Sequence, residues 1–162
     1  MDEILEILQK DANADISEIS AQINIPEEDV RKKISEYKKK GIIIKYKAVI
    51  NQELINNVSQ DVTALIEVKV TPQKNKGFDS IAKRVYNFPE VVSCFLLSGG
   101  YDLFVIVKGR DHNTISNFVS EKLAPMENII GTETHFILKK YKDDGDVLVT
   151  QQKEESRPII SA

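Results

Sequence analysis

The turn Ser98-Gly99-Gly100-Tyr101-Asp102 is the part of this 162-residue chain whose residue types best suit the binding of a small molecule. Two consecutive glycines let backbone amides approach a ligand closely, and such amides can hold an anion such as a carboxylate. The carboxylate of Asp102 can pair with an ammonium group. A site with both features suits a free amino acid, and Thr132 and Thr134 would add hydroxyl groups. The alternative is an ordinary hairpin turn, since a tight connection also favours Gly-Gly.

A second candidate surface is basic. Residues 31–47 carry eight basic side chains against Glu36 alone, which gives this segment a local charge of +7. Residues 1–30 carry nine acids and one base, and the whole chain has a net charge of −3. Because local charge sets what a surface attracts, the basic segment is a candidate for binding phosphates. The simpler interpretation of such a run is a solvated helix face, and the surrounding elements bear on the choice.

Helical periodicity predicts three helices in the N-terminal part of the chain. The first covers residues 2–10, the second residues 16–23, and the third begins at Pro26 or Glu27 and ends near Gly41. Two short helices joined by a tight turn, the second of them basic, describe a helix-turn-helix, whose second helix enters the major groove of DNA. Residues 42–50 are predicted to follow as a strand.

The third predicted helix has an apolar side and a polar side. Val30, Ile34 and Tyr37 recur at i, i+4 and i+7 and form the predicted buried stripe. Four acid-first pairs at i, i+4 spacing oppose DNA binding: Glu27–Arg31, Glu28–Lys32, Asp29–Lys33 and Glu36–Lys40. Each pair contributes only about 0.2–0.5 kcal/mol, so phosphate can displace it. The carboxylates would still repel the DNA backbone, and we therefore expect weak or salt-sensitive binding.

The second half of the chain alternates between strand and helix patterns. Strands are predicted at residues 62–70, 91–97, 103–107 and 129–140, and helices at residues 78–85 and 115–123. The order βαββαβ defines a ferredoxin-like fold, an antiparallel sheet with both helices on one face. The other face would expose apolar residues, so we expect a homodimer or a higher homo-oligomer.

Composition argues against several classes of protein. No apolar run approaches the roughly 18–20 residues that span a bilayer, and the acidic N-terminus does not resemble a secretory signal, so we expect a cytoplasmic protein without membrane contact. Cys94, the single cysteine, lies in an apolar stretch and reads as a buried hydrophobic residue. With only His112 and His135 as further soft ligands, we expect no metal site, no cofactor and no catalytic residue.

The order and spacing of six segments resemble the Lrp/AsnC (feast/famine) family of bacterial and archaeal transcription regulators over nearly the whole chain. These segments are ILEILQKD at 4–11, VRKKI at 30–34, GII at 41–43, YKAVIN at 46–51, CFLLSGGYDL at 94–103 and TET at 132–134. The resemblance implies a helix-turn-helix joined by a strand to a ferredoxin-like effector domain. It also implies dimers that assemble further, often into octamers, with amino acids bound between dimers near the glycine hairpin.

The resemblance implies site residues as well. The candidate DNA contacts are Arg31, Lys32, Ser35, Lys38 and Lys39. The candidate effector contacts are Gly99, Gly100, Tyr101, Asp102, Thr132 and Thr134. One departure concerns the start of the recognition helix, where Glu27, Glu28 and Asp29 stand in place of the small polar residues of many family members.

We therefore expect an α+β protein with four parts. These are a winged helix-turn-helix DNA-binding domain with a linking strand at 1–50, a linker at 51–61, a ferredoxin-like effector-binding and oligomerisation domain at 62–142, and a C-terminal extension at 143–162. The expected function is a sequence-specific transcription regulator that binds double-stranded DNA and responds to a small effector, an amino acid. Two alternatives stay open: a siroheme-decarboxylase-like enzyme, for which His112 and His135 are the available imidazoles, and an effector-sensing module that binds a protein instead of DNA.

Overall fold

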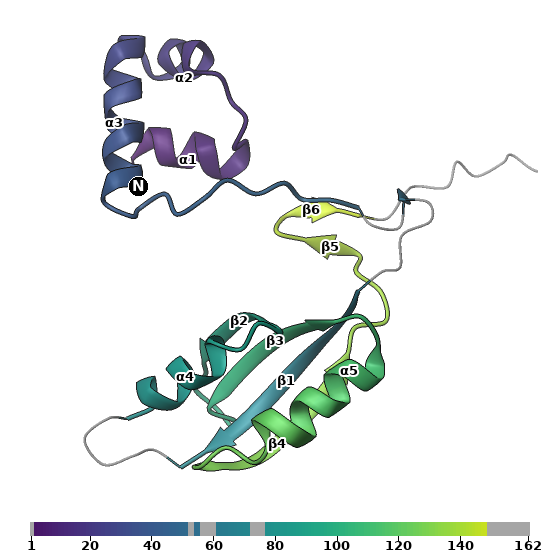
Figure 1. Cartoon of the computed structure of the whole chain (residues 1–162). Coiled ribbons are helices and arrows are strands. Elements are labelled where there is room, and N and C mark those ends of the chain that lie inside the picture. The colour runs from purple at the N-terminus through teal and green to yellow at the C-terminus, as the bar shows by residue number, and fades with distance from the viewer. Residues whose placement is uncertain (1, 52–53, 56–60, 72–76, 149–162) are drawn as a thin grey trace, which may run out of the picture. The chain divides into compact units, whose positions relative to one another are not determined.

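The computed structural model describes residues 2–51, 54–55, 61–71 and 77–148 (Figure 1). The chain divides into two compact units, residues 1–50 and 51–162. Most of the predicted linker and residues 149–162 of the predicted C-terminal extension lie outside the described residues.

The N-terminal unit contains three helices, α1 (Glu3–Lys10), α2 (Ile16–Ile23) and α3 (Glu27–Lys39). Side chains stabilise the first two at their starts, because Asp2 accepts a hydrogen bond from the Ile4 amide at 3.0 Å and Asp15 forms a capping box with Glu18. The turn between α2 and α3 passes through Asn24, which adopts the left-handed conformation. The three predicted helices are therefore confirmed within two residues of their expected bounds.

A small apolar core joins these helices. Ile4, Ile19 and Val30 contribute one fully buried side chain from each helix. Ile34 and Tyr37, the remainder of the predicted stripe on α3, pack against this core and stay partly exposed. The apolar periodicity of α3 thus fixes which side of the helix faces its neighbours and which side faces solvent.

The predicted strand over residues 42–50 is not formed. The helix α3 ends as expected, with Gly41 at a φ of 70° and the Ile42 amide donating to the Tyr37 carbonyl at 2.8 Å. Beyond it, residues 44–50 pair with no strand in the described part of the chain, and Ile44 is 88% exposed. A β-prone sequence becomes a strand only when a neighbouring strand supplies the ladder of hydrogen bonds, so local pattern alone was insufficient here.

The C-terminal unit contains a four-stranded antiparallel sheet. Its elements are β1 (Val62–Val70), α4 (Asp79–Tyr86), β2 (Val91–Leu96), β3 (Leu103–Gly109), α5 (His112–Asn117), the π-helix η2 (Phe118–Leu123), and β4 (Ile129–Phe136). The strand order is β2-β3-β1-β4, which is the predicted ferredoxin-like arrangement. A short hairpin of β5 (Lys142–Asp143) and β6 (Asp146–Val147) follows.

Two predictions for this unit need correction. The last strand was expected to reach residue 140, but β4 ends at Phe136, opposite Ala64. The Ile137 amide still donates to the Thr63 carbonyl at 2.9 Å, whereas residues 138–140 pair with no strand in the described part of the chain. The predicted helix over residues 115–123 is not a uniform α-helix, since α5 changes to the wider π-helix at Phe118. Its apolar residues still face the sheet, and Ile115, Phe118 and Leu123 are buried.

The two faces of the sheet differ in character. One face packs against α4, α5 and η2, and the residues of β1 on that face are at most 3% exposed: Ala64, Ile66, Val68 and Val70 (Figure 1). The alternate residues of β1 lie on the opposite face, which we call the open face. There Glu67 pairs with Phe104 of β3 on one side and with Glu133 of β4 on the other.

None of the helices in the described part of the chain combines the length and the apolar character that a membrane span requires.

Candidate functional site

The exposed side of α3 carries all five candidate DNA contacts. Arg31, Lys32, Ser35, Lys38 and Lys39 are exposed, while Val30 on the other side of the helix is buried. A shallow depression of about 350 Å³ runs along this surface and is lined by Ile16, Arg31, Ile34, Ser35 and Lys38. The helix-turn-helix therefore presents exposed polar and basic side chains that a DNA backbone can contact.

Three of the four predicted acid–base pairs on α3 are present. Arg31 lies 3.6 Å from Glu27, Lys32 lies 3.3 Å from Glu28, and Lys40 lies 3.3 Å from Glu36. All six side chains are more than half exposed, so each pair stabilises the helix only slightly. A phosphate oxygen can therefore replace these carboxylates at small cost.

The fourth predicted pair, Asp29–Lys33, is replaced by a contact between helices. Lys33 donates to Asp2 at 3.3 Å, and Tyr37 also hydrogen-bonds to Asp2. Burial raises the pKa of Asp2, but the hydrogen bonds from Tyr37, Ile4 and Lys33 outweigh it, so the pKa lies below its usual 3.8. Sequence spacing favoured Asp29 because i, i+4 neighbours are visible in the sequence, whereas the approach of α1 to α3 is not.

Lys38 has an aromatic neighbour that the sequence did not indicate. Its ammonium group lies 4.9 Å from the centre of the Tyr46 ring, within the range of a cation–π contact. This contact leaves the charge of Lys38 in solvent, so the side chain keeps its capacity to meet a phosphate.

The glycine hairpin connects β2 to β3. The Leu97 amide donates to the Asp102 carbonyl at 2.8 Å, which closes the loop, and both glycines are exposed. Neither Gly99 nor Gly100 has a positive φ, and an added Cβ at either position would meet nothing within 4 Å. The turn itself therefore does not require glycine at these two positions.

Asp102 is already engaged within the fold. Its carboxylate accepts from the Val70 amide at 2.9 Å and lies 3.5 Å from the ammonium group of Lys69. Lys69 also donates to the Gly100 carbonyl at 2.7 Å. Asp102 and Lys69 thus brace the hairpin against β1. Asp102 stays a candidate effector contact, and an ammonium ligand would share its carboxylate with these two partners.

Tyr101 extends from the hairpin to the open face of the sheet. Its hydroxyl donates to Glu133 on β4 at 2.7 Å. This hydrogen bond raises the pKa of Tyr101 above its usual 10.0, and partial burial and the charges of Glu133 and Glu67 raise it further. A residue of the hairpin is thereby tied to the far edge of the sheet.

The two threonines face the other way. Thr132 pairs with Val68 and Thr134 with Ile66, and residues paired directly across two strands lie on the same face. Both threonines are therefore on the helix-covered face. The structure thus separates these two hydroxyl groups from the Tyr101–Glu133 contact, and the six candidate effector residues do not form one cluster within a single chain.

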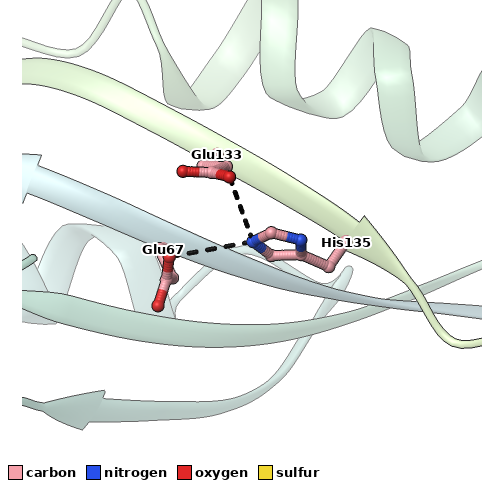
Figure 2. A group of neighbouring side chains, drawn as sticks. All are labelled: Glu67, Glu133 and His135. Carbon is pink, nitrogen blue, oxygen red and sulfur yellow. Dashed lines mark ion pairs between the residues drawn. The ribbon is translucent and has the colours of Figure 1, made fainter.

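The open face carries a cluster that the sequence did not reveal. Nε2 of His135 lies 3.7 Å from an oxygen of Glu67 and 3.7 Å from an oxygen of Glu133 (Figure 2). The alternation of Glu133 and His135 on β4 indicates a shared face, but the register of β4 on β1 is needed to bring Glu67 opposite.

The two histidines do not share a site. The His112 ring packs against Phe136 with 4.6 Å between ring centres, and Phe136 pairs with Ala64 on the helix-covered face. His135 lies on the open face. This separation gives no support to an enzyme that uses both imidazoles on one tetrapyrrole.

Family models match both units of the chain. Residues 63–147 match the Lrp/AsnC ligand binding domain, and residues 3–44 match a winged helix-turn-helix DNA-binding domain. The HTH-type transcriptional regulator YugG of Bacillus subtilis is 42% identical over 159 residues, which cover 98% of this chain and 95% of the relative. The HTH-type transcriptional regulator FL11 of Pyrococcus furiosus is 29% identical over 146 residues, which cover 90% of this chain and 92% of the relative.

Solved structures show the same architecture. A transcriptional regulator of Neisseria meningitidis in complex with L-Met superposes with a TM-score of 0.68 at 26% identity, covering 87% of this chain and 89% of that one. E. coli AsnC superposes with a TM-score of 0.64 at 23% identity, covering 85% and 89%. The predicted fold class and family resemblance are confirmed. The chain belongs to the Lrp/AsnC family and is a transcriptional regulator with a helix-turn-helix DNA-binding domain and a ligand-binding domain.

Proposed function

We propose that this regulator binds specific sites on double-stranded DNA through α3 and that an amino acid changes its assembly or its affinity for DNA. The observation that carries the proposal is the exposed side of α3, where five polar or basic side chains project from a helix anchored by its apolar stripe. Such side chains can reach base edges and phosphates in the major groove. The regulator would act in the cytoplasm, with the DNA-binding domain at residues 1–50 and the effector domain at 62–142.

The glycine hairpin supports the effector part of this proposal. Gly99 and Gly100 are exposed, and neither the backbone conformation nor packing within the chain demands glycine there. Glycine at these two positions would instead let a ligand or a second chain approach the backbone closely. The related Neisseria meningitidis regulator, solved in complex with L-Met, favours an amino acid.

The open face of the sheet supports a homodimer that can assemble further. Phe95 is 50% exposed and lies 6.5 Å, centre to centre, from the Phe104 ring on the neighbouring strand. A second copy would bury this apolar surface, and two copies of α3 would read two adjacent half-sites.

Fluorescence anisotropy with a labelled duplex from upstream of the protein's own gene tests DNA binding. We expect affinity to fall steeply with salt, and Lys39→Ala to weaken binding and to reduce the salt slope by about 1. Lys83→Ala on α4, an exposed lysine in the other unit, is the matched control. Absence of salt-dependent binding at low ionic strength would instead favour a protein partner.

The effector is tested by adding the common L-amino acids one at a time. We expect at least one of them to raise the melting temperature and to change either sedimentation or DNA affinity, because a ligand shifts an equilibrium in proportion to its preference for one state. Gly100→Val should abolish this response while leaving DNA binding of the ligand-free protein unchanged. If no amino acid changes any of these quantities, the effector part of the proposal is wrong.

A further inference from the structure

We propose that Glu67, Glu133 and His135 bind one divalent transition-metal ion, such as Zn²⁺, on the open face of the sheet (Figure 2). Glu67 comes from β1 and the other two residues from β4, so the site spans two neighbouring strands. The three ligands lie outside the helix-turn-helix and outside the hairpin at residues 98–102, on the same open face through which two copies of the chain are proposed to associate.

The register of the sheet places two carboxylates side by side next to the His135 imidazole. Glu67 and Glu133 are direct partners across β1 and β4, and like charges in that relation destabilise a sheet. The nearby ammonium group of Lys69 does not lie between them, because it donates to the Gly100 carbonyl at 2.7 Å and lies 3.5 Å from Asp102. A dication would offset both carboxylate charges.

The distances suit a small tetrahedral ion. Nε2 of His135 lies 3.7 Å from an oxygen of each glutamate, and the three donor atoms all lie within 4.8 Å of one another. Ligand atoms bound to Zn²⁺ at about 2.0–2.2 Å in tetrahedral geometry are about 3.4 Å apart. Closing the widest separation to that spacing takes a shift of at most about 1.4 Å, which rotations of the half-buried Glu67 and the exposed Glu133 and His135 side chains would supply.

A hydrogen bond from outside the three ligands orients one of them. The Tyr101 hydroxyl donates to Oε2 of Glu133 at 2.7 Å, which leaves Oε1 directed at His135. Partners of this kind orient metal ligands and strengthen binding. The imidazole favours Zn²⁺, Ni²⁺ or Cu²⁺ over Ca²⁺ or Mg²⁺, and a set of three protein ligands leaves one position for water.

Titration of the full chain, without a histidine tag, by ZnCl₂ tests the proposal. Calorimetry should show one ion per chain. The chain has two histidines, so imidazole NMR spectra contain an internal control: the His135 ring signals should shift on addition of Zn²⁺ while those of His112 stay in place. Glu67→Gln, Glu133→Gln and His135→Gln should each abolish binding, and Tyr101→Phe should weaken it about 10-fold.

Two controls separate this site from adventitious binding. His112→Gln and Glu127→Gln, which alter groups outside the cluster, should leave the Zn²⁺ affinity unchanged. Equal affinity in His135→Gln, or calorimetric binding without a shift of the His135 ring, would overturn the proposal. The NMR arm uses the unaltered protein, so the result stands even if a variant folds poorly.

Discussion

Asp2 connects α1 to α3 through a single carboxylate. It caps α1 at the Ile4 amide and receives hydrogen bonds from Lys33 and Tyr37 on α3. The sequence indicates the cap, because an aspartate precedes the apolar periodicity of the first helix. It does not indicate the two partners on α3, which lie more than thirty positions away.

The first prediction concerns acid stability at Asp2. Because the folded pKa of Asp2 lies below its usual 3.8, its charge stabilises the fold above that pH, and the contribution is lost as the pH falls through the folded value. Asp2→Ala should cost about 1 kcal/mol near neutral pH through loss of the cap, and Asp2→Asn less. Urea unfolding by circular dichroism should show the difference between the parent and Asp2→Asn vanishing at low pH; a constant difference at every pH would contradict this assignment.

The second prediction concerns the Tyr101 hydroxyl. Its pKa is raised chiefly by the hydrogen bond to Glu133, so Glu133→Gln should lower that pKa toward the usual 10.0. The raised pKa means that the stabilising contribution of Tyr101 is present below pH 10 and is lost as the pH rises through the folded value. An NMR titration of the tyrosine ring signals measures the pKa of Tyr101 in the parent and in Glu133→Gln. Glu127→Gln is the control that should leave the Tyr101 titration curve in place.

At the scale of elements, α3 balances its own stability against DNA binding. Glu28 pairs with Lys32 at 3.3 Å on the exposed side of the helix, near the region where phosphates would lie. Glu28→Gln removes a negative charge there and frees Lys32. We expect tighter DNA binding and a loss of helix stability of only about 0.2–0.5 kcal/mol.

Anisotropy titrations of Glu28→Gln and of Glu121→Gln, an exposed glutamate of η2, check that third prediction. Tighter binding should appear in Glu28→Gln alone. Unchanged affinity in that variant would show that the start of α3 stays away from the DNA backbone.

The fourth prediction compares glycines in two elements. A Cβ added at Gly109, the last residue of β3, would lie 2.9 Å from the buried Ile115 side chain of α5, whereas one added at Gly99 meets nothing within 4 Å. Gly109→Ala should therefore destabilise the C-terminal unit by about 1–3 kcal/mol, and Gly99→Ala by less than about 0.5 kcal/mol. Thermal unfolding of the two variants measures the contrast, and equal stabilities would show that α5 moves freely away from β3.

At the scale of the whole molecule, the open face is the surface through which copies of the chain are proposed to associate. Phe95 lies there and is 50% exposed, while Tyr86 on α4 is 52% exposed on the helix side. Phe95→Lys should shift sedimentation toward the monomer and weaken DNA binding, because a monomer reads only one half-site. Tyr86→Lys is the matched control, and an unchanged oligomer in Phe95→Lys would move the interface elsewhere.

Short-range pattern determined most of the elements of this protein. The apolar spacing of α1 to α3 predicted a helix-turn-helix, and the alternation of strand and helix patterns predicted the order of the elements from β1 to β4. These predictions hold because helix and strand periodicities depend on neighbours within a few positions. The strand expected over residues 42–50 did not form, because strand pairing depends on a partner segment that the local sequence does not identify.

Tertiary structure alone decided which side chains meet. The register of β4 on β1 placed Glu67 opposite Glu133, brought His135 between them, and turned Thr132 and Thr134 to the helix-covered face. Because α1 approaches α3, Lys33 pairs with Asp2 and not with Asp29. A shift of one residue in register reverses the face of every side chain in a strand, and that register is set by packing between segments distant in the sequence.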